Sequence, residues 1–115
     1  ELSDALVGTG FPYTDFKNLE KYIAIFRDMT QKAAGVRRPG AAALDLAYVA
    51  CGRFDGFFEF GLKTCDLAAG SLLVQEAGGL VTDFNGEEGF FESGDVLCGS
   101  PRVFGQMLQV IRQHL

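Results

Sequence analysis

The residues of this sequence best suited to chemistry are carboxylates placed where predicted elements meet. Asp66 stands at the start of a predicted helix of small residues, which Gly78 and Gly79 close. Asp is a favoured helix cap, yet at such a transition its carboxylate can also face a cleft and serve as an oxygen ligand. The spacing alone leaves both interpretations open.

Glu59 is the second such carboxylate, because it interrupts an aromatic segment between Phe58 and Phe60. Placing a charge among aromatic residues is costly unless the charge is solvated or paired. Either Glu59 faces outward on the polar side of a strand, or it lines a pocket. In a pocket, an ionised carboxylate only accepts hydrogen bonds and therefore suits the hydroxyl groups of a polyol.

Two further segments could bind an anionic or hydroxyl-rich ligand. Arg37 and Arg38 could hold one phosphate in a fork geometry, although surface arginines are common. Gly40, Ala41 and Ala42 open a predicted helix without bulky side chains, so their backbone N–H groups could meet a ligand. Tight helix packing explains these small residues equally well.

Hydrophobic periodicity assigns these residues to alternating strands and helices. The predicted strands are 6–7, 36–37, 54–60, 80–84 and 96–98, the predicted helices are 16–29, 41–50, 66–77 and 101–111, and 87–95 is a surface loop. This alternation predicts an α/β layered domain with a mostly parallel (mixed) sheet of about five strands flanked by helices. Ligands bind beyond the carboxyl ends of such strands, where Arg37, Glu59 and Asp66 fall.

The composition narrows the classes of function. The chain has 115 residues, 48% of them hydrophobic, which is enough for one domain with a real core. A net charge of −5 argues against a nucleic-acid or anionic-membrane surface. One histidine, His114, and three cysteines without a C-x-x-C pair leave little material for a zinc site or a histidine triad. The Gly8-Thr9-Gly10 turn lacks the lysine of a phosphate-binding loop, so no nucleotide site is predicted there.

No signal segment and no apolar run of about 18 residues is evident in the sequence. The odd number of cysteines suits free thiols. We therefore expect a soluble protein of a reducing compartment, the cytoplasm, with no membrane contact.

Two blocks in the correct order resemble signatures of the inositol monophosphatase family. Asp66-Leu67-Ala68-Ala69-Gly70 followed by Glu76-Ala77-Gly78-Gly79 is similar to the family pattern W-D-x-A-A-G…E-A-G-G, and the segment from Gly40 to Glu59 is similar to the block before it. The resemblance covers essentially the whole chain and is greatest to a bacterial subgroup. Cys65 departs from the pattern, because the family usually has Trp there.

The resemblance implies that residues 1–115 form the C-terminal α/β domain of that fold. It implies a magnesium-dependent, lithium-sensitive phosphatase acting on phosphate monoesters such as inositol monophosphate. Asp66 would be a Mg²⁺ ligand close to the substrate hydroxyls, and Glu59 would bind the inositol ring. Gly40, Ala41 and Ala42 would line the pocket through their backbone, and Arg37 would lie on the substrate side.

The N-terminal half of the family, with its D-P-x-D-G-T motif and the remaining metal ligands, is absent from these residues. Metal-assisted phosphate hydrolysis uses ions held about 4 Å apart, and one Asp cannot fix two of them. We therefore predict no catalytic residue in this chain and an isolated domain without activity.

Other functions remain open. A sugar bisphosphate or an adenosine bisphosphate could be the substrate, since relatives of both kinds exist. The chain could also be a non-catalytic interaction module, because the bacterial subgroup includes members with roles in transcription complexes. The family resemblance further implies a homodimer.

Overall fold

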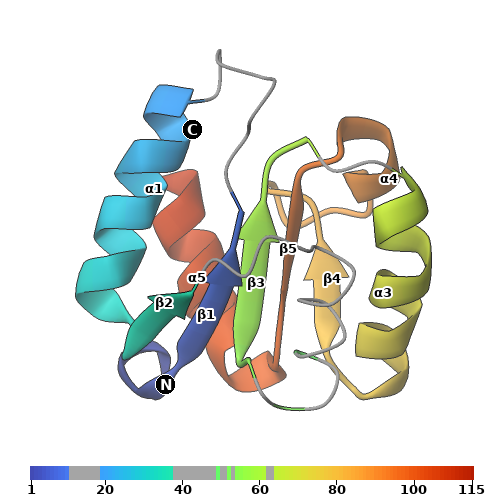
Figure 1. The fold of residues 1–115 in the computed structure, drawn as a ribbon, viewed down its shortest axis with the longest axis horizontal. Helices are drawn as coiled ribbons and strands as arrows, with labels where there is room; N and C mark the ends of the chain where they lie inside the picture. Colours follow the sequence, from blue (N-terminus) through green and yellow to red (C-terminus); the bar gives the residue numbers. More distant parts are fainter. Residues whose placement is uncertain (11–18, 38–48, 50–51, 53, 62–63) are drawn as a thin grey trace.

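The centre of the fold is a sheet of five strands in the order β2-β1-β3-β5-β4 (Figure 1). The computed structural model describes residues 1–10, 19–37, 49, 52, 54–61 and 64–115. The strands are β1 (Leu6–Thr9), β2 (Gly35–Arg37), β3 (Gly56–Glu59), β4 (Leu80–Thr82) and β5 (Val96–Gly99).

The direction of the strands confirms the predicted mixed sheet. β1 runs parallel to β2 and β3, whereas β5 runs antiparallel to its neighbours β3 and β4. Strands β1 to β4 therefore share one direction, and their carboxyl ends meet at one edge of the sheet. We call this edge, where Thr9, Arg37 and Glu59 end their strands, the carboxyl edge.

Helices cover both faces of the sheet (Figure 1). They are η1 (Leu2–Asp4), α1 (Leu19–Lys32), α3 (Thr64–Glu76), α4 (Phe90–Ser93) and α5 (Pro101–Arg112). α1 and α5 lie on one face, and α3 lies on the other and begins at the carboxyl edge.

Two local predictions needed correction. The predicted loop over residues 87–95 contains the one-turn helix α4, because burial of Phe90 to 4% exposure holds that turn against the core. α3 begins at Thr64, so Asp66 lies in the first turn of the helix rather than at its cap. The predicted helix 41–50, apart from the helical residue 49, and the start of the predicted helix 16–29 lie outside the described residues.

The alternating side chains of the strands build two cores. Val7, Phe58 and Leu97 point toward α1 and α5, and their neighbours Phe57, Val96 and Cys98 point toward α3. A strand sends successive side chains to opposite faces, so an apolar run such as Phe57-Phe58 is typical of a strand covered on both sides. The predicted strand 54–60 is thus observed as β3, covered on both faces.

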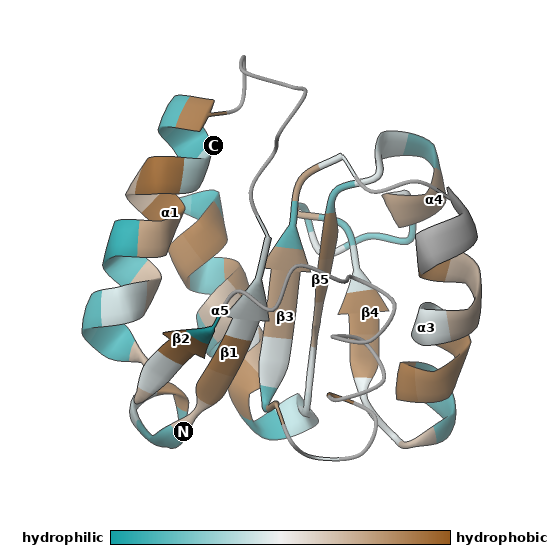
Figure 2. Ribbon diagram, in the orientation of Figure 1, coloured by the Kyte–Doolittle hydropathy of each residue, from teal (hydrophilic) through white to brown (hydrophobic). Residues whose placement is uncertain are grey.

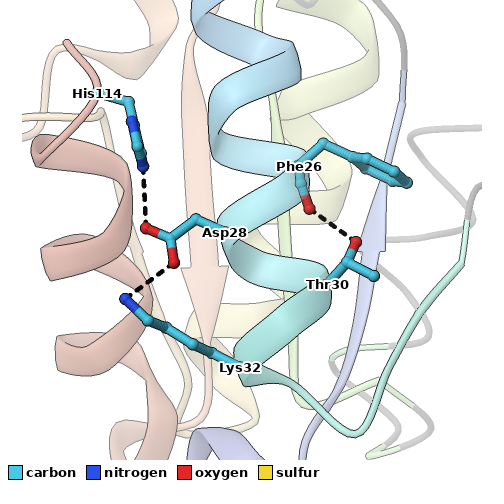
Figure 3. Close-up of polar contacts among 5 residues, drawn as sticks. All are labelled: Phe26, Asp28, Thr30, Lys32 and His114. Atoms are coloured by element: carbon cyan, nitrogen blue, oxygen red, sulfur yellow. Dashed lines mark hydrogen bonds and ion pairs between the residues drawn. The ribbon is translucent and has the colours of Figure 1, made fainter.

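α5 is held on the sheet by an apolar stripe and tied to α1 at its far end. Val103, Met107 and Ile111 are fully buried, as their helical spacing predicts. Beyond the helix, His114 Nε2 lies 2.9 Å from Asp28 Oδ2 on α1, while Lys32 Nζ lies 2.8 Å from Asp28 Oδ1 (Figure 3).

α3 differs from α5 in having apolar residues on its outer side as well (Figure 2). Leu67 and Val74 are buried against the sheet, whereas Leu72 and Leu73 are 55% and 47% exposed. Gly78, with φ of 88°, follows the helix and permits the left-handed turn into β4.

Candidate functional site at the carboxyl edge

Glu59 lies where β3 ends, and its carboxylate reaches across to the end of β1. The backbone of Glu59 pairs with Val96 on one side. On the other side, a Cβ atom added to Gly10 would overlap Oε1 of Glu59 and lie 3.3 Å from Oε2. The carboxylate therefore occupies the space that any side chain at position 10 would need.

The alternation of the strands sets the face on which this contact occurs. Phe57 belongs to the core under α3, so Glu59, two residues later on the same strand, faces the same way. Asp66 is in the first turn of α3, the helix that covers this face. Glu59 and the first turn of α3, which contains Asp66, thus lie on one face and at one edge of the sheet.

A buried pair of hydroxyl groups lies on the opposite face of the sheet, where β1 and β3 end. Thr9 and Tyr22 are both fully buried. Thr9 Oγ1 donates a hydrogen bond of 3.0 Å to the carbonyl oxygen of Phe58 and lies 3.3 Å from the hydroxyl oxygen of Tyr22. The Phe58 carbonyl belongs to the peptide bond that joins Phe58 to Glu59, so these hydroxyl groups fix the backbone next to Glu59.

Tyr22 is neutral at ordinary pH. Burial raises the pKa of Tyr22 above its ordinary value, the hydrogen bond with Thr9 lowers it, and the negative charge of Glu59 raises it again. The ring is fixed by aromatic neighbours, with centroids 6.0 Å from those of Phe26 and Phe58. The neutral hydroxyl of Tyr22 therefore does not repel the Glu59 carboxylate.

Arg37 ends β2, but its side chain does not join this group. Its Nη1 donates to the carbonyl oxygen of Val36 at 3.2 Å and would lie 3.4 Å from a Cβ added to Gly35. The guanidinium group thus folds back along β2, on an exposed part of the surface. The structure does not bring Arg37 and Glu59 together.

Other predicted site residues fall outside what the structure describes. Gly40, Ala41 and Ala42 lie outside the described residues, and of Asp66 only the backbone is described. Within the described part of the chain, no group of three or more His, Cys, Asp or Glu side chains could hold a metal ion. Two hollows on the surface of α5, one beside η1 and one along Gly105 and Arg112, do not include Glu59.

The sequence did not identify Thr9, Gly10 and Tyr22 as part of this site. The signal was present in part, since a glycine turn at the end of a strand marks close backbone approach. Tyr22 gave no signal of its own, because it fits the apolar stripe of α1.

No helix in the described ranges combines the length and apolar character that crossing a membrane requires.

Comparison with known proteins agrees with the fold and the sequence blocks. Residues 1–115 match the inositol monophosphatase family. The chain is 57% identical over 115 residues to the putative Nus factor SuhB of Neisseria meningitidis serogroup B, covering all of this chain and 44% of that protein.

Two solved structures show the same architecture. The extragenic suppressor protein suhB from Bartonella henselae superposes with a TM-score of 0.93 at 38% identity, over 99% of this chain and 43% of the other. An inositol monophosphatase from Anabaena gives a TM-score of 0.87 at 36% identity, over 100% of this chain and 46% of the other. The chain thus spans less than half the length of the relatives it matches.

Proposed function

Because the chain belongs to the inositol monophosphatase family, we propose that the whole protein is a Mg²⁺-dependent phosphatase that hydrolyses inositol monophosphate or a similar phosphate monoester. The observation that carries this proposal is the Glu59 carboxylate, held against Gly10 at the carboxyl edge of the sheet. Ligands of α/β sheets bind at that edge.

In this proposal Glu59 binds the alcohol part of the substrate. Its carboxylate accepts hydrogen bonds from ring hydroxyl groups and thereby orients the phosphate ester. The backbone of Gly40, Ala41 and Ala42 lines the pocket, and Arg37 contributes to the phosphate side once its side chain turns toward the carboxyl edge.

Asp66 would supply one oxygen ligand for Mg²⁺, the type of donor that this ion prefers. When bound, the metal supplies an activated water and stabilises the leaving oxygen. We propose that the remaining ligands come from the rest of the protein, as the family resemblance implies. The isolated domain is therefore expected to be inactive.

Phosphate release from inositol monophosphate by the full-length protein tests this proposal. We expect release that depends on Mg²⁺, stops with a chelator, is inhibited by lithium, and is absent from the 115-residue chain alone. Glu59→Gln should lower kcat/KM about 10-fold to 100-fold, chiefly through KM, since one charged hydrogen-bond partner is lost. Asp28→Asn is the control, because Asp28 lies on α1 and contacts Lys32 and His114.

A sugar bisphosphate or adenosine bisphosphate that is hydrolysed faster than inositol monophosphate would change the substrate of the proposal and keep the reaction. Mg²⁺-dependent activity of the isolated domain would contradict the division of metal ligands between the two halves. Absence of phosphatase activity from the full-length protein on every one of these esters would overturn the proposal itself.

A second function, in a transcription complex, is favoured by the name of a relative. The protein of Neisseria meningitidis that is 57% identical to this chain is called a putative Nus factor. We propose that the whole protein acts in the cytoplasm as a homodimer and also associates with transcription proteins. Co-purification of the RNA polymerase complex with both the wild type and Asp66→Asn would support a role independent of hydrolysis, and light scattering would give the oligomeric state.

A further inference from the structure

Two consecutive residues at the end of β1, together with one residue of α1, act on Glu59 from both sides of the sheet. On the face covered by α3, Gly10 leaves the space that the carboxylate fills. On the opposite face, Thr9 pairs with Phe58 in the β1–β3 register and bonds its carbonyl oxygen. Tyr22 lies behind Thr9 and is fully buried.

We propose that Gly10, Thr9 and Tyr22 form a positioning unit that places the Glu59 carboxylate and so determines how strongly the site prefers a polyol phosphate over a phosphate ester without ring hydroxyls. The inference rests on the proposed phosphatase function. None of the three residues needs to touch the substrate, because each acts through Glu59.

The geometry explains why Thr9 and Gly10 are needed. A glutamate side chain has several rotatable bonds. Contacts at its peptide and at its carboxylate both restrict the conformations that it can adopt. Thr9 holds the peptide before Glu59 through its bond to the Phe58 carbonyl. Gly10 provides the place for the far end, since even an alanine there would overlap Oε1.

The same geometry makes substitution at Gly10 informative. The atom that an added Cβ would meet is the end of a flexible side chain, so the fold can survive while the carboxylate moves. Gly8 offers a matched control on the same strand and face. A Cβ at Gly8 would lie 3.0 Å from the ring of Phe54 and 3.2 Å from that of Phe57, so it disturbs packing without reaching Glu59.

The test measures kcat and KM of the full-length protein for inositol monophosphate and for nitrophenyl phosphate, which has no polyol hydroxyls, at saturating Mg²⁺. Gly10→Ala should raise KM for inositol monophosphate about 10-fold and leave kcat/KM for nitrophenyl phosphate within about twofold. Tyr22→Phe should act in the same direction by about threefold. Gly8→Ala should lower the melting temperature and leave the ratio of the two kcat/KM values unchanged.

A double-mutant cycle shows whether the effect passes through Glu59. Glu59→Ala removes both the carboxylate and the clash, so Gly10→Ala and Tyr22→Phe should have no further effect on KM in that background. This is the expected result, and a purely structural role would not produce it.

The inference is overturned if Gly10→Ala and Tyr22→Phe weaken both substrates equally, or if their effects persist unchanged with Glu59→Ala. If the wild-type protein hydrolyses neither substrate, the proposed function fails and the inference fails with it. A wild type that is active, with Glu59→Ala selective and Gly10→Ala neutral, overturns the positioning unit alone.

Discussion

Two carboxylates of this domain, Glu59 and Asp28, are held by opposite means. Asp28 on α1 lies within 2.9 Å of Lys32 on the same helix and of His114, which ties α1 to the end of the chain (Figure 3). Glu59 lies at the carboxyl edge against a glycine backbone, with a neutral phenol behind it. Asp28 thus joins two elements of the fold, whereas the Glu59 carboxylate fills the space of a missing side chain at the edge where we propose that the substrate binds.

The largest effect is expected for Asp66→Asn, which tests whether Asp66 belongs with Glu59 in this comparison. Loss of a residue that only hydrogen-bonds a metal ligand typically lowers metal affinity or activity about 10-fold to 100-fold. Loss of a direct ligand should therefore lower kcat about 100-fold or more. Stability should change by only about 0.3–1 kcal/mol, the usual value of an anion in the first turn of a helix. Activity assays and urea denaturation of the full-length protein measure the two effects, and unchanged activity would remove Asp66 from the site.

Asp28→Asn should give the reverse pattern. The free energy of unfolding should fall by about 1 kcal/mol, because Lys32 and His114 lose their charged partner. Both kcat and KM for inositol monophosphate should stay within about twofold of the wild type, since α1 presents this residue to α5 and not to the carboxyl edge. A change of KM for inositol monophosphate comparable with that of Glu59→Gln would break the distinction between the two carboxylates.

Acid should reveal the charge pairing of Asp28. Hydrogen bonds from Lys32 and then His114 lower the pKa of the Asp28 carboxyl below its ordinary value. The unfolded chain, with a pKa of about 3.9, takes up the proton first, so the stabilisation is complete above about pH 4 and is lost as the pH falls through the lower folded value. The difference in unfolding free energy between the wild type and Asp28→Asn should therefore shrink below about pH 4. A constant difference down to about pH 2 would contradict this assignment.

The smallest effect is expected for Lys32→Met. The Lys32 side chain is 49% exposed and pairs with Asp28 one helical turn away, so its loss should cost about 0.3–0.5 kcal/mol. The difference should diminish in concentrated salt, which screens exposed charges. Lys21→Met, at an exposed position of the same helix, is the control and should change the stability by less.

The elements with strong periodicity were predictable from the sequence. The apolar stripe of α5 and the short apolar strand β5 are where the pattern places them, with Ser100 and Pro101 at the start of the helix. Such segments carry their own signal, because burial of one stripe or of both faces leaves a local pattern of residue types. α4 was missed because one turn is too short to produce a period.

The candidate site was predictable only in part. Glu59 was singled out as a charge among aromatic residues, and Asp66 by its place at a helix start, but nothing local indicates that Gly10 faces Glu59. That contact exists because β1 lies beside β3 in the sheet. Arg37, chosen by its place at a strand end, has a side chain that folds back to Val36, and rotamer choice leaves no trace in the spacing of residues.

The sequence by itself determined the alternation of strands and helices, the family, and which carboxylates are candidates for ligand binding. These features depend on residues close together in the chain. Only the tertiary structure decided that the end of β1 supports Glu59 from both faces of the sheet. The physical reason is that strand order and register bring together residues far apart in the sequence. A missing Cβ at Gly10 and a buried hydroxyl at Tyr22 acquire a role only from the neighbour that the fold places beside them.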